Sequence, residues 1–554
     1  MIKNGSEILA EVLVEQGVDT VFGYPGGSVL NIYDALYKYR DKIRHIMTAH
    51  EQGAAHAADG YARATGRTGV VLSTSGPGAT NLVTGIATAY MDSVPMVAIT
   101  GNVGTSLIGR DSFQEVYIAG ITMPITKHNF VVRRVEDLAD ILRRAFQIAA
   151  SGRKGPVLVD IPKDVTAAKC VFTPAAPVRT EVDNSRATEE RLRTAAALIN
   201  TAKRPAVLFG GGVSSSGAGE ELRALLDKAD IPAAYTLMAA GVLGYGEPHN
   251  LGLLGMHGCV SANRAVGEAD VLLAIGTRFS DRVALDTGRF ASGAKIIHID
   301  IDPSEINKNV GIDFDIIGDV KAVLLALLPF VEKANHTDWM QTIAQWQARD
   351  YRPKDKPDAL TPHQIMRDIC DIAGEDAVFA TDVGQHQMWA AQYIRHLHPN
   401  SFITSGGLGT MGFGYGAAIG ASIGLGGRRI IHITGDGSFH MNMNEACTAV
   451  TYDVPVITVI FNNRALGMVR QWQTVFYGKR YSSSEPDRRT DYVKVGEGFG
   501  VKAYRAATPS EFEAAFRKAM TTDGPVWIEC VIDREEKVLP MIPAGGTIKD
   551  TIVD

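Results

Sequence analysis

The sequence predicts an α/β fold of three doubly wound domains, each a parallel sheet with helices on both faces. Three observations predict it. Short apolar runs rich in β-branched residues alternate with helical stretches along the chain, which is typical of parallel sheets buried on both faces. A long stretch near the N-terminus recurs in weakened form near the C-terminus. The length of 554 residues allows for two to four domains.

The internal repeat relates residues 70–101 to residues 430–461. Each copy has an apolar run, a Gly-x-Gly turn, a helical stretch, and then Asp, Val-Pro and a second apolar run. Both copies later reach Gly-Pro-Val followed by an apolar strand, at 155–159 and 524–528. The offset of about 360–370 residues is too long for a solenoid period, so we predict two homologous domains.

A further α/β unit lies between the two copies. Its strands are predicted at 206–209, 269–276 and 295–300, and proline-containing segments at 173–184 and 350–362 predict the linkers. We therefore predict a first domain at 1–172, a central domain at 185–348, a third domain at 360–540 and a C-terminal tail at 541–554.

Composition excludes several classes of protein. The net charge is −6 and the sequence contains no basic run, so we expect no nucleic-acid partner. Five scattered cysteines without CxxC spacing favour reduced thiols over disulfides or zinc. No apolar run reaches membrane-spanning length, and the N-terminus lacks a secretory apolar core. We expect a cytoplasmic protein with no membrane partner, or the mature form of an imported one.

One motif carries the chemistry. Gly435-Asp436-Gly437 follows a predicted strand, and Asn462-Asn463 ends the next strand, with residues 438–461 between them. A helix is predicted from about residue 443. Two neighbouring strand ends would then present a carboxylate and an amide oxygen, ligands that suit Mg²⁺ together with phosphates. Asp-Gly alone is a common turn, and only its spacing to Asn-Asn makes a magnesium-held diphosphate the better interpretation.

That spacing resembles the signature of enzymes that use thiamine diphosphate. In that family one domain binds the diphosphate through Mg²⁺, and a paralogous domain binds the pyrimidine ring and supplies a glutamate. Glu51 opens an alanine-rich helical stretch in the first copy and matches that glutamate, whose carboxyl shares a proton with the pyrimidine. The plain alternative is a glutamate favoured by the dipole at a helix N-terminus.

Nearly the whole chain resembles acetolactate synthase, also called acetohydroxyacid synthase, in its catalytic-subunit form. The resemblance rests on short matches at Phe22–Gly27, His50–Gly53, Ser75–Asn81, Phe113–Glu115, Ile125–Asn129, Gly255–Gly258, Arg278–Arg282, Gly407–Gly412 and Leu466–Trp472. It implies that the first domain binds the pyrimidine, that the central domain is FAD-binding-like, and that the third domain binds diphosphate and Mg²⁺.

The resemblance implies roles for individual residues. The catalytic residues would be Glu51, Gln114 and Lys127, and the Mg²⁺ ligands Asp436, Asn463 and the carbonyl of Ala465. Substrate would meet Phe113, Lys127, Met468, Val469 and Trp472. Thiamine diphosphate would be bound by Pro25, Gly26, Glu51, Thr74, Pro77, Asn81, Gln114, Gly384, Gln385, His386, Gly409, Met411, Gly435, Asp436, Gly437, Ser438, Asn463, Leu466, Gly467 and Met468.

Two of these residues have specific roles in the family. Met411 would be the apolar wedge that bends the cofactor, and Trp472 would favour the larger acceptor, 2-oxobutyrate. FAD would be bound by Arg153, Gly210, Gly211, Gly212, Thr236, Leu237, Met238, Leu254, Gly255, Met256, His257, Gly276, Arg278, Arg282, Asp300, Ile301, Asp319 and Val320. The net reaction transfers no electrons, so this FAD would be structural.

The expected activity is decarboxylation of pyruvate on thiamine diphosphate and transfer of the hydroxyethyl unit to a second pyruvate or to 2-oxobutyrate. The products, 2-acetolactate and 2-aceto-2-hydroxybutyrate, lead to valine, leucine and isoleucine. The alternatives are a pyruvate oxidase with active FAD, a glyoxylate carboligase, an acetolactate synthase without FAD, and a non-catalytic regulatory paralogue. The resemblance also implies a homodimer or homotetramer with shared active sites, and a small regulatory subunit.

Overall fold

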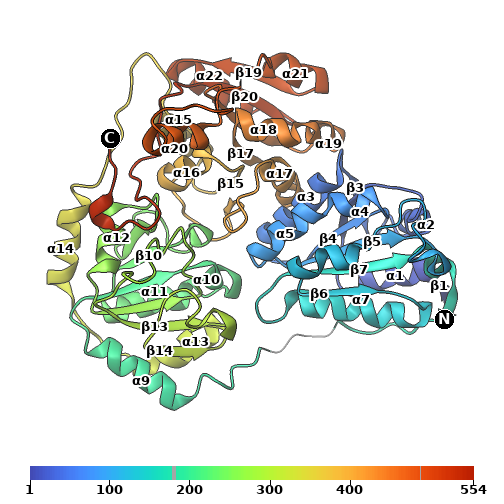
Figure 1. The fold of residues 1–554 in the computed structure, drawn as a ribbon, viewed down its shortest axis with the longest axis horizontal. Helices are drawn as coiled ribbons and strands as arrows, with labels where there is room; N and C mark the ends of the chain where they lie inside the picture. The colour runs from blue at the N-terminus through green and yellow to red at the C-terminus, as the bar shows by residue number, and fades with distance from the viewer. Residues whose placement is uncertain (178–181, 487) are drawn as a thin grey trace. The chain divides into compact units, whose positions relative to one another are not determined.

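The computed structural model describes residues 1–177, 182–486 and 488–554, and the chain divides into two compact units (Figure 1). The first unit comprises Met1–Glu181, Val378–Gly384 and Ile403–Val531. The second comprises Val182–Ala377, Gln385–Phe402 and Ile532–Asp554. Residues 178–181, within the linker predicted at 173–184, lie outside the described residues. No helix in the described part of the chain is long and apolar enough to cross a bilayer.

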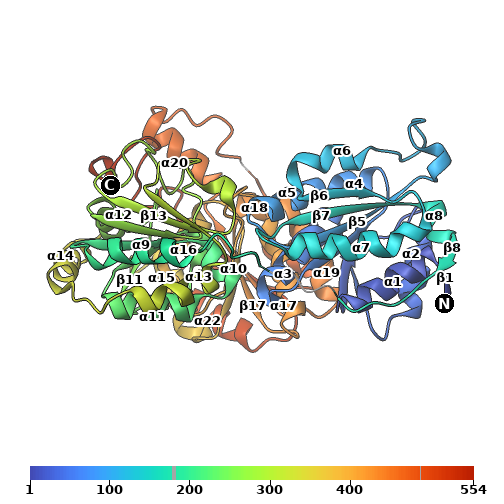
Figure 2. The same cartoon turned by 90° about the horizontal axis from the view of Figure 1, so that it is seen from below.

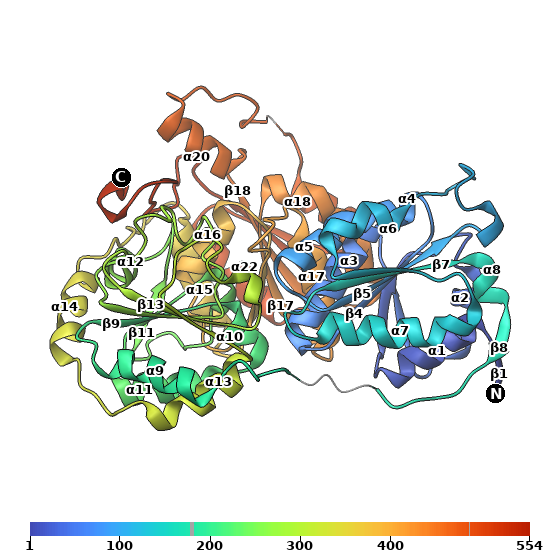
Figure 3. The same ribbon diagram turned by 60° about the horizontal axis from the view of Figure 1, so that its bottom comes forward.

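The first sheet has six parallel strands in the order β3-β2-β4-β5-β7-β6. Figures 2 and 3 show α1 and α7 on one side of it and α4 and α6 on the other. The strands are β2 (Thr20–Gly23), β3 (Arg44–Met47), β4 (Gly69–Ser73), β5 (Met96–Asn102), β6 (His128–Val131) and β7 (Pro156–Pro162). The helices are α1 (Gly5–Glu15), α2 (Leu30–Lys38), α3 (Glu51–Thr65), α4 (Pro77–Asn81), α5 (Val83–Met91), α6 (Ile118–Thr122), α7 (Val135–Ala150) and α8 (Lys163–Ala167).

A short antiparallel pair accompanies the first sheet. It joins β1 (Ile2–Asn4) to β8 (Lys169–Val171). The amphipathic segment that follows β1 forms α1, and its apolar residues Ile8, Leu9, Val12 and Leu13 are buried in the core.

The third sheet, also in the first unit, has the order β16-β15-β17-β18-β20-β19. Renumbered within each sheet, the first and third orders are both 2-1-3-4-6-5, which is the shared topology that the repeat predicts. The strands are β15 (Val378–Thr381), β16 (Phe402–Ile403), β17 (Ile430–Gly435), β18 (Val456–Asn462), β19 (Lys502–Ala506) and β20 (Val526–Val531). The helices of the first unit in this region are α17 (Phe413–Gly424), α18 (Asp436–Asn442), α19 (Ala446–Thr451), α20 (Gly467–Phe476), α21 (Tyr492–Phe499) and α22 (Pro509–Met520). Two further helices, α15 (Pro362–Ala373) and α16 (Gln385–Tyr393), belong to the second unit.

The central sheet lies in the second unit and has six parallel strands in the order β11-β10-β9-β12-β13-β14. Renumbered, this is 3-2-1-4-5-6, the order common among dinucleotide-binding domains. Its strands are β9 (Pro205–Phe209), β10 (Ala233–Tyr235), β11 (Asn250–Leu253), β12 (Val271–Ile275), β13 (Lys295–Asp300) and β14 (Phe314–Ile317). Its helices are α9 (Glu189–Asn200), α10 (Gly211–Ser216), α11 (Gly219–Ala229), α12 (Val260–Gly267), α13 (Val320–Leu327) and α14 (Thr337–Gln347).

The predicted fold class is therefore confirmed as three doubly wound parallel sheets. One local prediction was wrong. We expected the helix after the Gly-Asp-Gly turn to begin near residue 443, but α18 begins at Asp436 and a 3-10 turn, Met443–Glu445, separates it from α19. The short and mostly polar sequence at 436–442 hid this helix because its burial comes from the surrounding elements, not from an apolar period of its own.

The first and third sheets of the first unit are joined by the contact of α3 with α17. Glycines allow the two backbones to touch, because a Cβ at Gly60 would overlap the carbonyl of Ala417 and one at Gly420 would overlap the carbonyl of Ala57. His56 is fully buried in this contact, with its ring 5.3 Å from that of Phe413. The two homologous domains, each with its own hydrophobic core, therefore pack directly against one another.

We expect Gly420→Ala to destabilise the first unit by about 1–3 kcal/mol, because the added methyl would force α3 and α17 apart. Gly498→Ala is the matched control, since Gly498 lies inside α21 and its Cβ would meet nothing within 4 Å. The control should gain up to about 1 kcal/mol from helix propensity. Denaturant unfolding checks both, and equal behaviour of the two variants would contradict the close approach.

Candidate functional site

Two pairs of strand ends in the first unit form the expected binding positions. In an open parallel sheet, ligands bind where the connections from adjacent strands diverge to opposite faces. In the order 2-1-3-4-6-5 this point lies between β2 and β4 in the first sheet, and between β15 and β17 in the third. Most of the residues that we predicted to bind thiamine diphosphate follow one of these four strands.

The first position gathers what we call the Glu51 cluster, which consists of Gly26, Glu51, Thr74, Gly78 and Asn81. Asn81 Nδ2 donates to Glu51 Oε2 at 3.0 Å. A methyl group added at Gly78 would lie 3.1 Å from Glu51 Oε1 and 2.7 Å from Thr74 Cγ2, and one added at Gly26 would lie 2.5 Å from Thr74 Cβ. The backbone at both glycines therefore packs directly against Thr74, and at Gly78 also beside the half-buried Glu51 carboxyl.

The start of α3 fixes where Glu51 lies. His50 Nδ1 caps the helix by accepting the Gln52 N–H at 3.1 Å. The buried Glu445, from the third domain, accepts the backbone N–H groups of Ala49 and His50, each at 3.1 Å. Burial raises the pKa of Glu445. The third domain therefore positions the turn that presents Glu51.

Gln114 and Lys127 lie in different surroundings. Gln114 has a left-handed backbone, with φ of 59°, and a methyl group at Gly76 would lie 2.8 Å from its carbonyl oxygen, so Gln114 borders the Glu51 cluster. The adjacent Phe113 is 88% exposed. Lys127 donates from Nζ to the carbonyls of Ile148 and Ser151, the latter at 2.6 Å, at the end of α7. This contact stabilises a helix C-terminus, and the catalytic role of Lys127 stays a prediction.

The second position gathers the Asp436 cluster, which consists of Met411, Asp436, Gly437, Asn463 and Leu466. Asp436 directly follows β17 and Asn463 directly follows β18, two adjacent strands whose residues Gly435 and Phe461 are paired. Asp436 is only 5% exposed, and this burial raises the pKa of its carboxyl to about 7. A buried carboxyl beside a buried amide fits a cation site, because a bound cation would stabilise the carboxylate there.

Met411 and Leu466 form the apolar side of the Asp436 cluster, next to Gly437. A methyl group at Gly437 would lie 2.6 Å from Leu466 Cδ2 and 3.9 Å from Met411 Cε, so these three residues meet. The Gly412 N–H donates to Ser438 Oγ at 3.0 Å. Asn463 Oδ1 accepts the Ala465 N–H at 3.1 Å, a turn that places Ala465 beside the amide. Gly435 ends β17, Gly384 and Gly409 lie in the connections after β15 and β16, and Gly467 and Met468 open α20.

Gln385 and His386 form the first turn of α16, in the second unit, and both are buried. Gln385 Nε2 donates to the carbonyl of Glu536. The predicted substrate residues Met468, Val469 and Trp472 lie on α20, where Val469 is 49% exposed and the ring of Trp472 lies 5.2 Å from that of Phe476.

Sequence reasoning missed Asp382, the first residue after β15. Its Oδ1 accepts the Gly414 N–H at 2.7 Å, its Oδ2 accepts the Thr434 hydroxyl at 2.6 Å, and His432 Nε2 lies 3.3 Å from Oδ2. Burial alone would raise the pKa of Asp382, but these contacts outweigh it and lower the pKa to about 2. Asp382 therefore ties β15, β17 and α17 together under the Asp436 cluster. Its signal was an acidic residue at a strand end two residues before Gly384.

Sequence reasoning also missed Glu529 on β20. Asn462 Nδ2 donates to Glu529 Oε1 at 2.7 Å, and Arg505 Nε donates to its Oε2 at 2.7 Å. The first asparagine of the Asn-Asn pair is therefore a structural residue that fixes the end of β18, whereas Asn463 accepts the Ala465 N–H in the turn that follows.

The central sheet holds the residues predicted for FAD at its own switch point, between β9 and β12. A methyl group at Gly212 would lie 2.6 Å from the Cα of Gly276, and one at Gly211 would lie 3.1 Å from Met238 Cβ. The turn after β9 thus packs on the turn after β12, beside Met238, while Thr236 and Leu237 precede it along the chain. The backbone there is bare and close, as phosphate binding by a dinucleotide domain requires.

A second group of predicted FAD residues lies after β11. The Met256 N–H donates to the carbonyl of Arg282 at 2.9 Å, and Leu254 and Gly255 adjoin it. His257 is 8% exposed, its Nδ1 has no hydrogen-bond partner among the described residues, and burial lowers its pKa to about 4. A buried neutral imidazole with an unsatisfied nitrogen fits a polar ligand.

Other predicted FAD residues have identifiable structural contacts. Asp319 caps α13 by accepting the Ala322 N–H, and Val320 begins that helix. Asp300 Oδ1 accepts the Asp302 N–H across Ile301, and the carbonyl of Arg278 accepts a hydrogen bond from Asn309. Arg153 belongs to the first unit, where its Nε donates to Ser93 Oγ at 2.9 Å. The FAD-binding roles of all these residues stay predictions.

Comparison with known proteins gives consistent matches over the chain. Models of thiamine pyrophosphate enzymes match it in three parts: the N-terminal TPP binding domain at residues 3–121, the central domain at 192–327 and the C-terminal TPP binding domain at 382–530. A probable acetolactate synthase large subunit of Methanocaldococcus jannaschii is 46% identical over 99% of this chain and 95% of its own.

Two bacterial proteins give similar figures. The acetolactate synthase of Mycobacterium bovis is 46% identical over 99% of this chain and 91% of its own. The acetolactate synthase isozyme 2 large subunit of Escherichia coli K12 is 44% identical over 98% of both chains.

The stability that Asp382 provides should depend on pH. Because the pKa of Asp382 falls from 3.8 to about 2 on folding, its ionised form stabilises the fold above pH 3.8, and this contribution disappears as the pH falls towards 2. The shift corresponds to about 2 kcal/mol. Asp382→Asn should lower the unfolding free energy by about 3–5 kcal/mol at pH 7, and less at pH 3.

Urea unfolding between pH 7 and pH 3 measures this difference. Asp34→Asn is the control, because the Asp34 side chain is 71% exposed and its loss should change stability by less than about 1 kcal/mol. A gap between wild type and Asp382→Asn that stays constant with pH would contradict the assignment.

Proposed function

This chain belongs to the thiamine pyrophosphate enzymes, as an acetolactate synthase large subunit, and on that premise we propose the reaction that its residues carry out. It decarboxylates pyruvate and transfers the two-carbon unit to a second pyruvate or to 2-oxobutyrate, in the biosynthesis of branched-chain amino acids. The observation that carries the proposal is the buried Asp436 carboxyl beside Asn463, at the ends of two paired strands.

Asp436, Asn463 and the carbonyl of Ala465 would hold Mg²⁺, and with it the diphosphate. When bound, thiamine diphosphate supplies the electron sink that lets carbon dioxide leave. Gly435 and Gly437 leave the backbone open to phosphate oxygens, and Met411 supports the cofactor from the apolar side. The contact of Met411 with Gly437 and Leu466 supports this arrangement.

Glu51 would hold and exchange the proton of the pyrimidine ring. Asn81 orients its carboxyl, and Gly26 and Gly78 let the backbone approach Thr74 closely beside it. Since the two halves of the cofactor would be bound by paralogous domains, we propose that two chains share each active site. The 88% exposure of Phe113, beside Gln114, supports a site completed by a second copy. A small regulatory subunit is proposed from the names of the relatives, which call them large subunits.

FAD is proposed as a structural cofactor of the central domain. The strand order 3-2-1-4-5-6, the close glycine turns after β9 and β12, and the buried His257 support it. We further propose a cytoplasmic enzyme. A pyruvate oxidase is the rival reaction, and oxygen uptake with peroxide formation distinguishes it from the carboligase.

Glu51→Gln should lower kcat for acetolactate formation from pyruvate by about 10²–10⁴-fold, the usual contribution of a positioned acid or base. The amide keeps the shape of the carboxyl but cannot exchange its proton. Glu136→Gln is the matched control, since Glu136 also lies in a first helical turn but is 54% exposed. Assays contain Mg²⁺ and thiamine diphosphate, and products are identified by mass spectrometry.

The wild-type protein and the control should both form acetolactate. If the wild type made acetaldehyde, acetyl phosphate or peroxide instead, the carboligase assignment would be wrong. Full activity of Glu51→Gln would remove Glu51 from the mechanism.

Trp472→Leu should shift the choice of acceptor towards pyruvate. An aromatic wall that meets the extra methylene of 2-oxobutyrate discriminates by about 1–3 kcal/mol, so the product ratio at equal substrate concentrations should change by about 10-fold or more. Phe476→Leu, one turn along α20 and in contact with Trp472, controls for packing. An unchanged ratio in Trp472→Leu would show that Trp472 does not meet the acceptor.

A further inference from the structure

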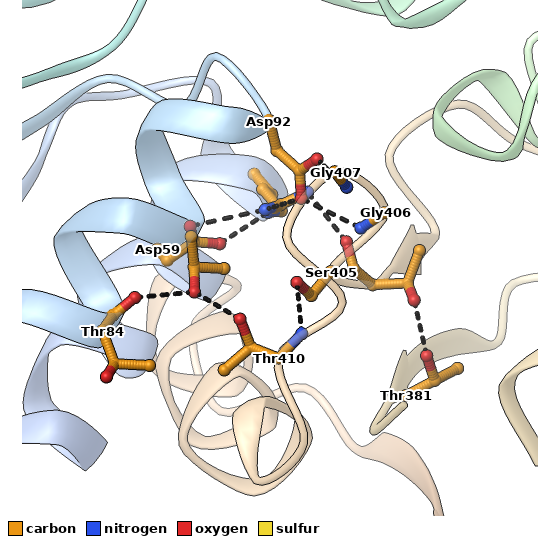
Figure 4. Close-up of polar contacts among 11 residues, drawn as sticks. Asp59, Thr84, Asp92, Thr381, Ser405, Gly406, Gly407 and Thr410 are labelled. Atoms are coloured by element: carbon orange, nitrogen blue, oxygen red, sulfur yellow. Dashed lines mark hydrogen bonds and ion pairs between the residues drawn. The ribbon is translucent and has the colours of Figure 1, made fainter. Parts of the chain in front are cut away.

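A buried polar network joins the first domain to the segment that carries Met411. We call residues 404–410 the anchor loop, which leads from β16 towards α17. Figure 4 shows Asp92 of the first domain against Gly406 and Gly407 of this loop, with Asp59 and Thr84 on the neighbouring helices. The anchor loop and the first-domain residues that contact it both lie in the first unit. None of these residues belongs to the Glu51 cluster or to the Asp436 cluster.

Arg63 is the cation of this network. It lies on α3 with a side chain that is 10% exposed, and its Nε donates to Asp59 Oδ1 at 2.5 Å. Its Nη2 donates to Asp92 Oδ2 at 2.9 Å, and its Nη1 donates to the carbonyl of Thr404 at 2.9 Å. A guanidinium with three directed hydrogen bonds inside a protein fixes its partners in space.

Asp92 carries the contact to the loop. Its carboxylate has no exposed surface, and it accepts the Gly407 N–H on Oδ1 at 2.6 Å and the Gly406 N–H on Oδ2 at 3.1 Å. A methyl group at Gly407 would lie 2.8 Å from Asp92 Oδ1 and 2.8 Å from the carbonyl of Met91, so only glycine fits here. The loop backbone is therefore held directly by a charged side chain of the other domain.

Further hydroxyl contacts complete the attachment. Thr88 Oγ1 and Thr410 Oγ1 are 2.7 Å apart, and Thr88 Oγ1 also donates to the carbonyl of Thr84 at 2.8 Å. Within the loop, the Thr410 N–H donates to Ser405 Oγ at 3.0 Å, and the hydroxyls of Thr381 and Thr404 are 2.7 Å apart. The last residue of the anchor loop is thus fixed to α5.

Met411 lies between this attachment and a second one. On its far side, the Gly412 N–H donates to Ser438 Oγ, and Asn442 Nδ2 donates to the carbonyl of Gly412 at 2.6 Å. One side of Met411 is therefore held by the first domain through Asp92 and Thr88, and the other by α18. Its side chain reaches the surroundings of Gly437 and Leu466 from between two fixed points.

We propose that Asp92 and Arg63 are positioning residues that set Met411 against the cofactor by holding the anchor loop from the opposite domain. This inference rests on the proposed function for the role of Met411, but the attachment itself does not. The two carboxylate oxygens of Asp92 accept hydrogen bonds from Arg63 and from the backbone N–H groups of Gly406 and Gly407. An amide at this position could accept only part of those bonds and would turn an N–H towards a donor.

Asp92→Asn tests the proposal, with Asp453→Asn as the matched control. Asp453 lies directly before the second Val-Pro of the internal repeat, where the first copy has Ser93, one residue after Asp92, and Asp453 is exposed. The first measurement is amide hydrogen exchange of the peptide covering residues 404–412 in the cofactor-free protein. We expect exchange at least tenfold faster in Asp92→Asn, and unchanged exchange in Asp453→Asn.

The second measurement uses the enzyme with Mg²⁺ and thiamine diphosphate. We expect kcat to fall at least tenfold in Asp92→Asn while KM for pyruvate stays within threefold of wild type. The exchange of the C2 proton of bound thiamine diphosphate should slow by a similar factor, which a general loss of stability would not produce. Thr88→Val removes the hydroxyl contact with Thr410 but keeps the contacts of Asp92. It should change the loop amide exchange, kcat and the C2 proton exchange in the same direction as Asp92→Asn, but by less.

Two results would overturn the proposal: loop exchange in Asp92→Asn that matches Asp453→Asn, or faster loop exchange with unchanged kcat and C2 exchange. If Asp92→Asn does not fold, Thr88→Val decides by the same criteria. Failure of the proposed function is separate, because it appears as wild-type protein that makes no acetolactate, while amide exchange still tests the attachment.

Discussion

The edge at which parallel strands end is the constraint on which the rest of this structure depends. In a doubly wound sheet every strand delivers its last residue to one edge, and helices cover that edge except where the connections diverge. The chain uses this point three times, after β2 and β4, after β15 and β17, and after β9 and β12. Polar residues and bare backbone gather at each of them, and the neighbouring strands β3 and β18 add Glu51 and Asn463.

The first and third domains depend on one another as well as on their own sheets. Gly60 and Gly420 let α3 and α17 meet at backbone distance, and Glu445 holds the turn before Glu51. In the opposite direction, Arg63 and Asp92 hold the loop before Met411. Each domain therefore holds a segment of its paralogue that carries a predicted site residue, and the two copies pack as one compact unit.

The residues at the candidate site divide into those predicted to contact a ligand and those that hold them in place. Asn462 and Asn463 illustrate the division, since the Asn462 amide donates to Glu529 on β20, whereas Asn463, the predicted Mg²⁺ ligand, accepts the nearby Ala465 N–H. The buried acids divide similarly. Asp382 is ionised by its contacts with His432 and Thr434, whereas Asp436 has a raised pKa because burial is not balanced by comparable partners.

The sequence by itself determined the three α/β units, the duplication and the residues at the strand ends, because apolar periodicity and glycine turns are local properties of the chain. It predicted Asp436 and Asn463 from their spacing, and Glu51 from a family resemblance. Only the tertiary structure revealed Asp382, Glu529, Arg63 and Asp92. Their partners lie tens to hundreds of residues away, or on another strand, and an isolated acidic or basic residue in a sequence looks the same on a surface as in a core. The tertiary structure also showed that Lys127 donates to carbonyls at the end of α7, and that α18 begins at Asp436. Contacts with neighbouring elements, which the local sequence pattern does not reveal, decide both.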